Sequence, residues 1–345
     1  MSIIAVVPAV TEPDIDQTLR SLLDQTRAPE RIVVAINNAP DDTTAEAAAR
    51  IQDPRIEVVD LGQITGRKAG ALNRAIGYAA PKPWDMVLCM DADTVMTSTW
   101  IAAALDALGD GPRGRADAAG AVFLADDDSG WLKGCTAREW SRYTLANTIR
   151  DHTHVLSGTA ALIRFSALER VRARFGHWYA EDAICEDARL TIDLKLTGSR
   201  LVSPASCAVR TDVMATVPDL LKQRARWSKG ALENLSARGL NATTAVYWRQ
   251  QALLLASICL FWAFLVLSVV VIPIWGIQLT ALSVALLAVF VTERVITVWD
   301  MGWRHRIAAA ALVPEMAYAF LLQLAHVRAL LTTLSGRSMQ WHHAS

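Results

Sequence analysis

The stretch Val87-Leu88-Cys89-Met90-Asp91-Ala92-Asp93-Thr94 determines how the rest of the chain is interpreted. Four apolar residues followed at once by two carboxylates are typical of a buried strand that ends in a cleft. In open α/β sheets the ligand crevice lies outside the carboxyl ends of the strands. Asp91 and Asp93 can both turn toward that crevice, where two hard oxygen donors suit a Mg²⁺ or Mn²⁺ that also holds phosphate oxygens. An isolated Asp-x-Asp is more often a solvated turn. The other motifs must therefore indicate whether Asp91 and Asp93 form a metal site.

The composition argues against several classes of protein. The 345 residues carry 34 Lys+Arg and 34 Asp+Glu, a balance that gives no reason to expect a nucleic-acid partner. The 5 cysteines are scattered without C-x-x-C spacing, which indicates reduced thiols on a cytosol-facing chain rather than a disulfide framework or a zinc site. The mean hydropathy of +0.25 is high for a soluble enzyme, and the apolar excess lies after residue 250. The N-terminus lacks the basic and long apolar regions of a signal peptide, so we expect the first 240 residues to stay on the side of the membrane where they are made.

Strands and helices alternate along the first part of the chain. Apolar runs predict strands, and helical spacing predicts helices between them; the strands are expected at residues 3–7, 31–36, 56–59, 87–90 and 118–124, and the helices at 14–25, 43–50 and 66–78. This alternation indicates βαβ units, and therefore an α/β fold with a mostly parallel sheet. No Gly-x-Gly-x-x-Gly follows the first strand, which argues against the usual dinucleotide-binding fold. The run Asp126-Asp127-Asp128 is expected to be a solvated turn rather than a second metal site.

Two further motifs lie between residues 150 and 200. Ser157-Gly158-Thr159 is a small-residue turn that leads into a strand, followed by a helix at 166–174. Glu186 and Asp187 stand at the head of another predicted helix. Position alone favours a structural interpretation of this pair, because acidic residues stabilise helix N-termini through capping and the helix dipole.

Residues 218–238 predict a basic amphipathic helix. Its apolar stripe is accompanied by cationic side chains; the stripe contains Leu220, Trp227, Ala231 and Leu235, and the cations are Lys222, Arg224, Arg226, Lys229 and Arg238. Since a membrane segment follows, the helix is expected to lie in the membrane interface with its basic face toward lipid phosphates. An ordinary surface helix is the alternative.

The last hundred residues predict a membrane region. Residues 251–273 contain no charged residue and are long enough to cross the hydrocarbon core, and residues 276–292 form a second apolar run. The distribution of Lys and Arg places 273–277 outside and 301–306 inside. A third run at 307–331 is interrupted by Pro314, Glu315, Gln323, His326 and Arg328, so both two and three crossings stay open.

Taken in order, the motifs resemble those of membrane-integrated members of glycosyltransferase family 2, the group that includes cellulose, chitin, hyaluronan and poly-N-acetylglucosamine synthases. They are Val6-Val7-Pro8, Lys68-Ala69-Gly70-Ala71-Leu72-Asn73, Asp91-Ala92-Asp93, Ser157-Gly158-Thr159, Glu186-Asp187 and Gln223-Arg224-Ala225-Arg226-Trp227, the last being the family's Gln-x-x-Arg-Trp. The resemblance implies the GT-A fold, a nucleotide-sugar-binding α/β sheet, in a cytosolic catalytic domain at residues 1–215. An interface helix at 216–240 and a multi-pass region of the cytoplasmic membrane at 249–345 would follow. The tail at 328–341 resembles the family's interfacial segment, which favours two crossings.

The resemblance also implies an inverting, metal-dependent sugar transfer. The donor would be a nucleoside diphosphate sugar, most often UDP-linked, and the acceptor a hydroxyl of a glycan or a lipid-linked molecule, giving a β-linkage. Asp93 resembles the ligand of Mg²⁺ or Mn²⁺, Asp91 the carboxylate beside nucleotide and metal, and Asp187 the general base, with Glu186 next to it. The remaining implied contacts are Lys68, Asn37, Gln223 and Arg226 with the donor, and Trp227, Ser157, Gly158 and Thr159 with the acceptor sugar.

Two departures from the family pattern keep alternatives open. Asn37-Asn38 stand where the family usually has an Asp-Asp pair that holds uracil, so this motif does not determine the nucleotide. The synthases also usually carry transmembrane helices before the catalytic domain, and this sequence begins with a strand. A single copy is therefore not expected to form a polysaccharide channel, which leaves an oligomer or the transfer of one or a few sugars.

The sequence disfavours three other functions. A lipid-phosphate sugar transferase of the dolichol-phosphate-mannose kind is disfavoured by the Gln-x-x-Arg-Trp motif. A sugar nucleotidylyltransferase is disfavoured by the membrane hairpin and by Glu186-Asp187. A catalytically silent membrane scaffold is disfavoured because the acidic set is complete.

Overall fold

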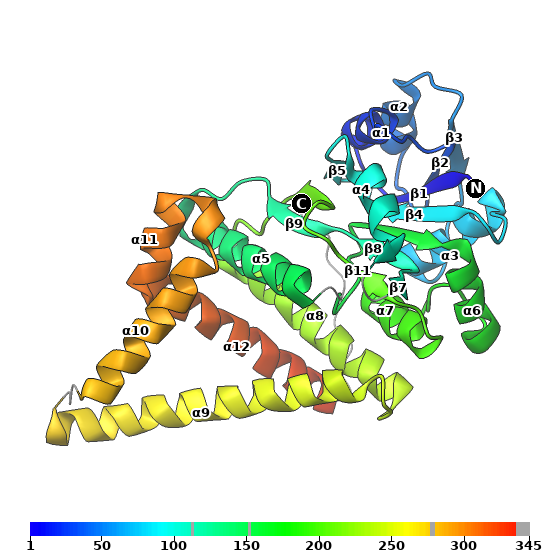
Figure 1. The fold of residues 1–345 in the computed structure, drawn as a ribbon. Coiled ribbons are helices and arrows are strands. Elements are labelled where there is room, and N and C mark those ends of the chain that lie inside the picture. Colours follow the sequence, from blue (N-terminus) through cyan, green and yellow to red (C-terminus); the bar gives the residue numbers. More distant parts are fainter. Residues whose placement is uncertain (112–113, 151–152, 277–279, 336–345) are drawn as a thin grey trace. The chain divides into compact units, whose positions relative to one another are not determined.

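The computed structural model describes residues 1–111, 114–150, 153–276 and 280–335 (Figure 1). By its internal contacts the chain divides into two compact units, which are described separately. The first unit contains Met1–Asp128 and Glu139–Val213, and the second contains Ser129–Arg138 and Met214–Ser345.

The first unit is built on a seven-stranded sheet with the order β11-β8-β10-β4-β1-β2-β3 (Figure 1). Four strands are linked by parallel pairs; they are β1 (Ile3–Ala9), β2 (Arg31–Ile36), β3 (Ile56–Asp60) and β4 (Met86–Met90). β10 (Ala160–Arg164) lies antiparallel between β4 and β8 (Ala118–Gly120), and β11 (Leu201–Val202) pairs parallel with β8.

The antiparallel strand corrects the expected sheet. The α/β class is confirmed, but the sheet is mixed rather than mostly parallel on the β10 side. An apolar run has the same pattern in either orientation, so the sequence could not reveal the reversal. The reversal has a consequence for the site: Ala160 pairs with Met90, so the turn that precedes β10 lies at the carboxyl end of β4.

Helices cover both faces of this sheet. Alternate residues of β1 point into two different cores, Ile3, Ala5 and Val7 into one and Ile4 and Val6 into the other. The first core contains residues of α1 (Ile15–Leu23), α2 (Thr43–Ala49) and α4 (Trp100–Ala107). The second contains residues of α3 (Arg67–Ala79), α6 (Phe165–Phe175) and α7 (Glu186–Leu196).

The strand expected at 118–124 is in fact two strands. β8 belongs to the large sheet, whereas β9 (Val122–Ala125) pairs with β12 (Ala208–Thr211), which also pairs with β5 (Val95–Met96) in a small second sheet. A short hairpin of β6 (Asp110–Gly111) and β7 (Gly114–Arg115) completes the described strands. Residues 126–128 lie outside regular secondary structure, in agreement with the turn expected there.

The second unit is helical. It contains the start of α5 (Gly130–Arg150), then α8 (Val217–Arg238), α9 (Ala245–Trp275), α10 (Ala281–Ile296), the 3₁₀ helix η1 (Trp299–Met301), α11 (Trp303–Ala311) and α12 (Val313–Leu334). α8 begins at Val217, one residue before the predicted start, because the Thr216 side chain accepts a hydrogen bond from the Asp219 backbone N–H (3.3 Å) and Pro218 occupies the first turn. α8 and α12 pack along each other.

This packing corrects the predicted faces of α8. Leu220 and Leu235 of the expected apolar stripe are buried, but Trp227 and Ala231 are only half-buried. Lys229, expected on a lipid-facing basic surface, is buried with its Nζ 3.6 Å from Glu233 Oε1. The reason is that the buried face of α8 also includes polar positions such as Asn234, which a hydrophobic pattern does not mark.

Two helices of the described chain are long and apolar enough to cross a membrane. They are Ala245–Ile274, with a mean hydropathy of 2.8, and Val313–Leu334, with 1.3. The second predicted apolar run forms α10, which has 16 residues and is not one of the two. The last part of the predicted interfacial tail, residues 336–345, lies outside the described residues.

Candidate functional site

The site in the first unit forms where β4 ends. Asp91 directly follows β4, and its backbone N–H donates to the Thr159 carbonyl oxygen (2.9 Å). Asp91 is half-buried and Asp93 is exposed. Burial, together with the charges of Asp93 and Glu186, raises the pKa of Asp91 to about 6, while Lys68 opposes the rise. The predicted pair of carboxylates therefore stands at the edge of the sheet.

Lys68 is the central cation of this site. It lies in the first turn of α3, which begins after Gly66 in a left-handed conformation (φ 81°). Its ammonium group forms an ion pair with Asp91, lies 3.4 Å from Glu186 Oε1 and donates to the Gly158 carbonyl oxygen (3.1 Å). Burial alone would lower the pKa of Lys68, but the charges of Asp91, Glu186 and Asp187 outweigh it and raise that pKa above its usual value.

The Ser157-Gly158-Thr159 turn joins Lys68 to Asp187. Gly158 donates its backbone N–H to Asp187 Oδ2 (3.0 Å). A Cβ on Gly158 would stand 3.1 Å from Lys68 Nζ and 3.2 Å from Asp187 Oδ2, so only glycine leaves both groups where they are. The Ser157 and Thr159 hydroxyls bond to each other, which stabilises the turn.

Asp187 is held at the start of α7 by backbone groups. Its Oδ1 accepts from the Ala188 N–H (2.7 Å), and its carbonyl accepts from the Thr191 hydroxyl (2.7 Å). Burial and the charge of Glu186 raise the pKa of Asp187, and Lys68 partly offsets them. A carboxylate whose proton affinity is raised in this way is suited to act as a general base.

A small pocket is lined by these groups. Besides Lys68, Ser157, Gly158, Glu186 and Asp187, its lining includes Leu72, Cys89, Met90, Leu156, Ala161, Tyr179 and Leu190. Tyr179 was not predicted. It is held by Asn73, whose amide exchanges two hydrogen bonds of 2.9 Å with the Tyr179 backbone. Asn73 belongs to the motif that begins at Lys68, so the motif carried a signal for this contact.

Glu12 is a second residue that the sequence analysis missed. It follows β1, the neighbour of β4 in the sheet. Burial and the charges of Asp93 and Asp91 raise the pKa of Glu12 to about 7, so the three carboxylates repel one another. The rule that selected Asp91 and Asp93 also applies to the end of β1, but Glu12 stands three residues beyond it.

This excess of negative charge fits a divalent cation. Among the described residues no three His, Cys, Asp or Glu side chains cluster closely enough to hold a metal by themselves. Mg²⁺ in phosphate sites commonly uses one or two carboxylates and completes its shell with water and substrate oxygens. Asp91 and Asp93 offer such a donor set, and the nearby Glu12 adds to the negative charge around it.

The remaining predicted residues are distributed over both units. Asn37 follows β2 in the first unit and is buried, and its amide nitrogen donates to the Ala9 carbonyl (2.9 Å). Gln223, Arg226 and Trp227 lie on α8 in the second unit, where all three are half-buried. The structure therefore brings together Lys68, Asp91, the Ser157–Thr159 turn, Glu186 and Asp187, with Asp93 beside them.

Comparison with known proteins identifies a family and a fold. Residues 4–172 match the model of the family described as glycosyl transferase family 2. The poly-beta-1,6-N-acetyl-D-glucosamine synthase of Staphylococcus aureus is 28% identical over 233 residues, which cover 64% of this chain and 52% of that protein. The same values hold for the synthase of Staphylococcus epidermidis. The chain thus spans about half the length of the curated relatives that it matches.

A solved structure shares the fold. The mannosyltransferase PcManGT from Pyrobaculum calidifontis, in complex with GDP-Man and Mn²⁺, superposes with a TM-score of 0.63 at 18% identity, covering 98% of this chain and 88% of that one. The similarity shows that the first unit has the GT-A fold. The family model, the homology to the synthases and the fold lead to one conclusion: the chain belongs to glycosyltransferase family 2, a family of enzymes.

Proposed function

We propose that this enzyme transfers a sugar from a nucleoside diphosphate sugar, a UDP-sugar in the first instance, to a hydroxyl group of a glycan or lipid-linked acceptor. The transfer inverts the anomeric centre, so an α-linked donor gives a β-linkage. Residues 1–215 would be the catalytic domain, 216–240 an interface helix and 249–345 the membrane region.

The observation that carries the proposal is the contact set around Asp187. Its carboxylate has a raised pKa and stands beside Lys68 and Glu186 in the same pocket. In the proposed step Asp187 takes the proton of the acceptor hydroxyl while that oxygen forms a bond to the anomeric carbon. The bond from the anomeric carbon to the diphosphate breaks, and its electron pair leaves with the nucleoside diphosphate.

The cations of the site would stabilise this leaving group. In the first unit, Lys68 is a cation that lies between Asp91 and Glu186. Asp91 and Asp93 would hold Mg²⁺ or Mn²⁺, which when bound neutralises charge on the departing diphosphate. In the family pattern Gln223 and Arg226 would contact the diphosphate, since a guanidinium matches phosphate geometry. Trp227 would stack on the acceptor sugar, and the Ser157–Thr159 turn would border it.

The choice of a UDP-sugar follows the curated relatives, which are synthases of a poly-N-acetylglucosamine. Asn37 is proposed to meet the base through its side-chain oxygen, which accepts one hydrogen bond from Asn38 Nδ2 (3.4 Å) and has a second lone pair, because its amide nitrogen is already bonded to the Ala9 carbonyl. Since the chain covers about half the length of those relatives, polymer synthesis is one form of the proposal and transfer of a single sugar the other.

A place in the cytoplasmic membrane is part of the proposal. The two apolar helices α9 and α12 support it by their length and composition. The catalytic domain would then lie on the cytosolic side, where nucleotide sugars are made, and the acceptor would reach it from the lipid phase.

The test is nucleotide release by detergent-purified protein supplied with Mn²⁺ or Mg²⁺ and a panel of UDP-, GDP- and dTDP-sugars. One UDP-sugar should be turned over, and chelation of the metal should abolish the activity. Asp187→Asn should lower the rate by at least about 100-fold, since general-base catalysis contributes that much or more. Equal rates in Asp187→Asn and the unmodified protein would remove Asp187 from the base role.

The same assay separates the main alternative. The panel includes GDP-mannose, the donor in the complex of the Pyrobaculum mannosyltransferase, together with a polyprenyl phosphate as acceptor. Turnover of that pair alone would establish a lipid-phosphate sugar transferase instead. Product length, read by mass spectrometry, distinguishes polymer synthesis from single transfer.

A further inference from the structure

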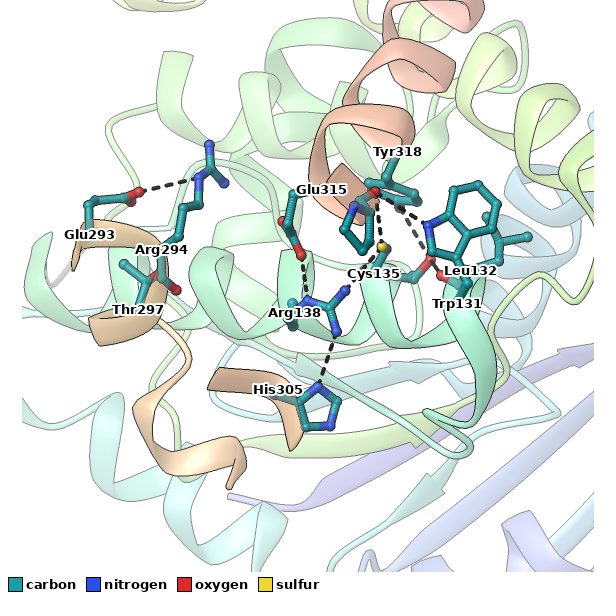
Figure 2. A network of polar contacts seen from close by, with 12 residues as sticks. Trp131, Leu132, Cys135, Arg138, Glu293, Arg294, Thr297, His305, Glu315 and Tyr318 are labelled. Carbon is teal, nitrogen blue, oxygen red and sulfur yellow. Dashed lines mark hydrogen bonds and ion pairs between the residues drawn. The ribbon is translucent and has the colours of Figure 1, made fainter. Parts of the chain in front are cut away.

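The start of α12 contacts the start of α5 within the second unit (Figure 2). The Trp131 indole N–H donates to the Pro314 carbonyl oxygen (3.4 Å). Arg138 and Glu315 form an ion pair whose side chains are only 5% and 7% exposed. His305 of α11 lies 3.4 Å from Arg138 Nη1. These contacts determine where the first turn of α12 lies against α5.

Tyr318 lies one turn further along α12, on the same side as Glu315. It is buried, and its hydroxyl lies 3.2 Å from Thr136 Oγ1 of α5. The same hydroxyl oxygen accepts a hydrogen bond from Arg224 Nη2 of α8 (3.2 Å). Tyr318 therefore joins three helices through one oxygen atom.

The proton positions of this group follow from its partners. Thr136 donates its hydroxyl proton to the Leu132 carbonyl (3.1 Å). Thr136 Oγ1 is then an acceptor, so the Tyr318 hydroxyl donates to it and accepts from Arg224, which has no acceptor atom. In this arrangement each hydroxyl donates once and accepts at least once.

Arg224 leads from this chain to Trp227. The two residues are three apart on α8, and the guanidinium carbon of Arg224 lies 4.6 Å from the centroid of the Trp227 ring. A planar guanidinium at this distance is attracted to an indole face and restricts its rotation. Arg224 occupies a variable position of the Gln-x-x-Arg-Trp pattern, so the pattern itself assigns it no role.

We propose that Tyr318 is a positioning residue: its hydroxyl holds Arg224, and Arg224 holds the indole of Trp227 in the orientation in which it receives the acceptor. The inference rests on the proposed function, because there Trp227 contacts the acceptor sugar. It extends that function by coupling the acceptor contact to α12, a candidate membrane helix. A movement of α12 would then change acceptor affinity without touching the donor.

The first experiment observes Trp227 without using activity. Full-length protein labelled with 5-fluorotryptophan in detergent gives ¹⁹F resonances, and Trp227→Phe identifies the one that belongs to Trp227 among the 12 tryptophans. Tyr318→Phe, which removes only the hydroxyl, should shift that resonance. Tyr78→Phe removes a hydroxyl from an exposed tyrosine of α3 and should leave it in place. An unmoved Trp227 resonance in Tyr318→Phe overturns the proposal.

The second experiment measures kinetics. Tyr318→Phe should raise the acceptor KM about threefold to tenfold, the usual effect of one lost hydrogen bond, with kcat and the donor KM unchanged. In a Trp227→Phe background the same substitution should have no further effect, since it acts through Trp227. Additive effects of the two substitutions would overturn the positioning role. If Trp227→Phe itself leaves the acceptor KM unchanged, the proposed function of Trp227 fails, while the ¹⁹F result still tests the contacts.

Discussion

Gly158 illustrates how little space surrounds the reacting groups. Its backbone bonds to both Lys68 and Asp187, and a Cβ would meet Lys68 Nζ and Asp187 Oδ2 at 3.1 and 3.2 Å. Both atoms end flexible side chains, so a methyl group would displace them without unfolding the domain. The proposed base and the cation of the site therefore both depend on one residue that has no side chain.

Gly158→Ala should accordingly lower kcat/KM by about tenfold while the thermal midpoint changes little, because its Cβ would push Lys68 Nζ and Asp187 Oδ2 out of their present positions, and misplacement of reacting groups is costly. Gly77→Ala in α3 is the matched control, since its Cβ would meet only Trp178 at 4.0 Å. That control should keep full activity and gain about 0.5–1 kcal/mol of stability from better helix propensity. Loss of activity that follows a drop in the thermal midpoint would contradict the explanation for Gly158.

The pKa of Asp187 gives a prediction for the pH profile. Burial and the charge of Glu186 raise this pKa, and the base acts only when it is deprotonated. The rate should therefore fall on the acid side at a higher pH than an ordinary aspartate would give. Glu186→Gln removes one of the two causes, so the pKa of Asp187 should drop and the acid limb of log kcat/KM should move to lower pH. If the acid limb of log kcat/KM stays in place or moves to higher pH, a group other than Asp187 determines it.

At the level of helices, the contact between α5 and α12 shows that the first turns of α12 lie against protein. Arg138 and Glu315 are both buried, and each leaves an uncompensated charge when the other is removed. In a helix counted among the candidate membrane spans, such a pair identifies the side that does not face lipid.

Glu315→Ala should therefore destabilise the second unit by about 3–5 kcal/mol, read as a lower thermal midpoint in detergent. The double variant Arg138→Met with Glu315→Met should recover most of that loss, because no unpaired charge remains. Lys222→Ala, which breaks an exposed pair with Asp219, serves as the control and should change stability by less than about 1 kcal/mol. Equal effects of the buried and exposed substitutions would contradict a role for the buried pair.

Taken together, the chain combines a sheet unit that carries the acidic site with a helical unit that exposes much apolar surface. α9 is the clearest case, since only 6% of its most apolar window is buried. Cys259 lies near the middle of α9 and is exposed, whereas Cys89, Cys135, Cys185 and Cys207 are buried. This distribution provides a built-in reporter of whether α9 is surrounded by lipid.

In native membranes Cys259 should resist a charged, water-soluble maleimide, because the hydrocarbon core excludes the reagent and disfavours the reactive thiolate. Leu240→Cys, placed at an exposed position before α9, should be labelled readily. Denaturation in SDS should make Cys259 reactive and so confirm that it is unmodified. Labelling of Cys259 in intact membranes at the rate of the Leu240→Cys control would exclude α9 as a membrane span.

Much of the fold could be read from local patterns. The alternation of apolar and helical periods gave the α/β class, and the expected helix at residues 66–78 differs from Arg67–Ala79 by one residue at either end. The sequence motifs also contain Lys68, Asp91, Gly158 and Asp187, and the structure brings these residues into contact.

Local sequence specifies periodicity, strand ends and motif chemistry, because these depend on a residue and its near neighbours. It does not specify which strands pair, so it could not reveal that β10 is antiparallel or that residues 118–124 serve two sheets. Glu12, Tyr179 and Tyr318 acquire their partners from segments far along the chain. The burial of Lys229 likewise follows from the packing of α8 and not from its hydrophobic pattern. Long-range packing determines these features, since charge coupling, burial and hydrogen bonding depend on distance in space rather than along the sequence.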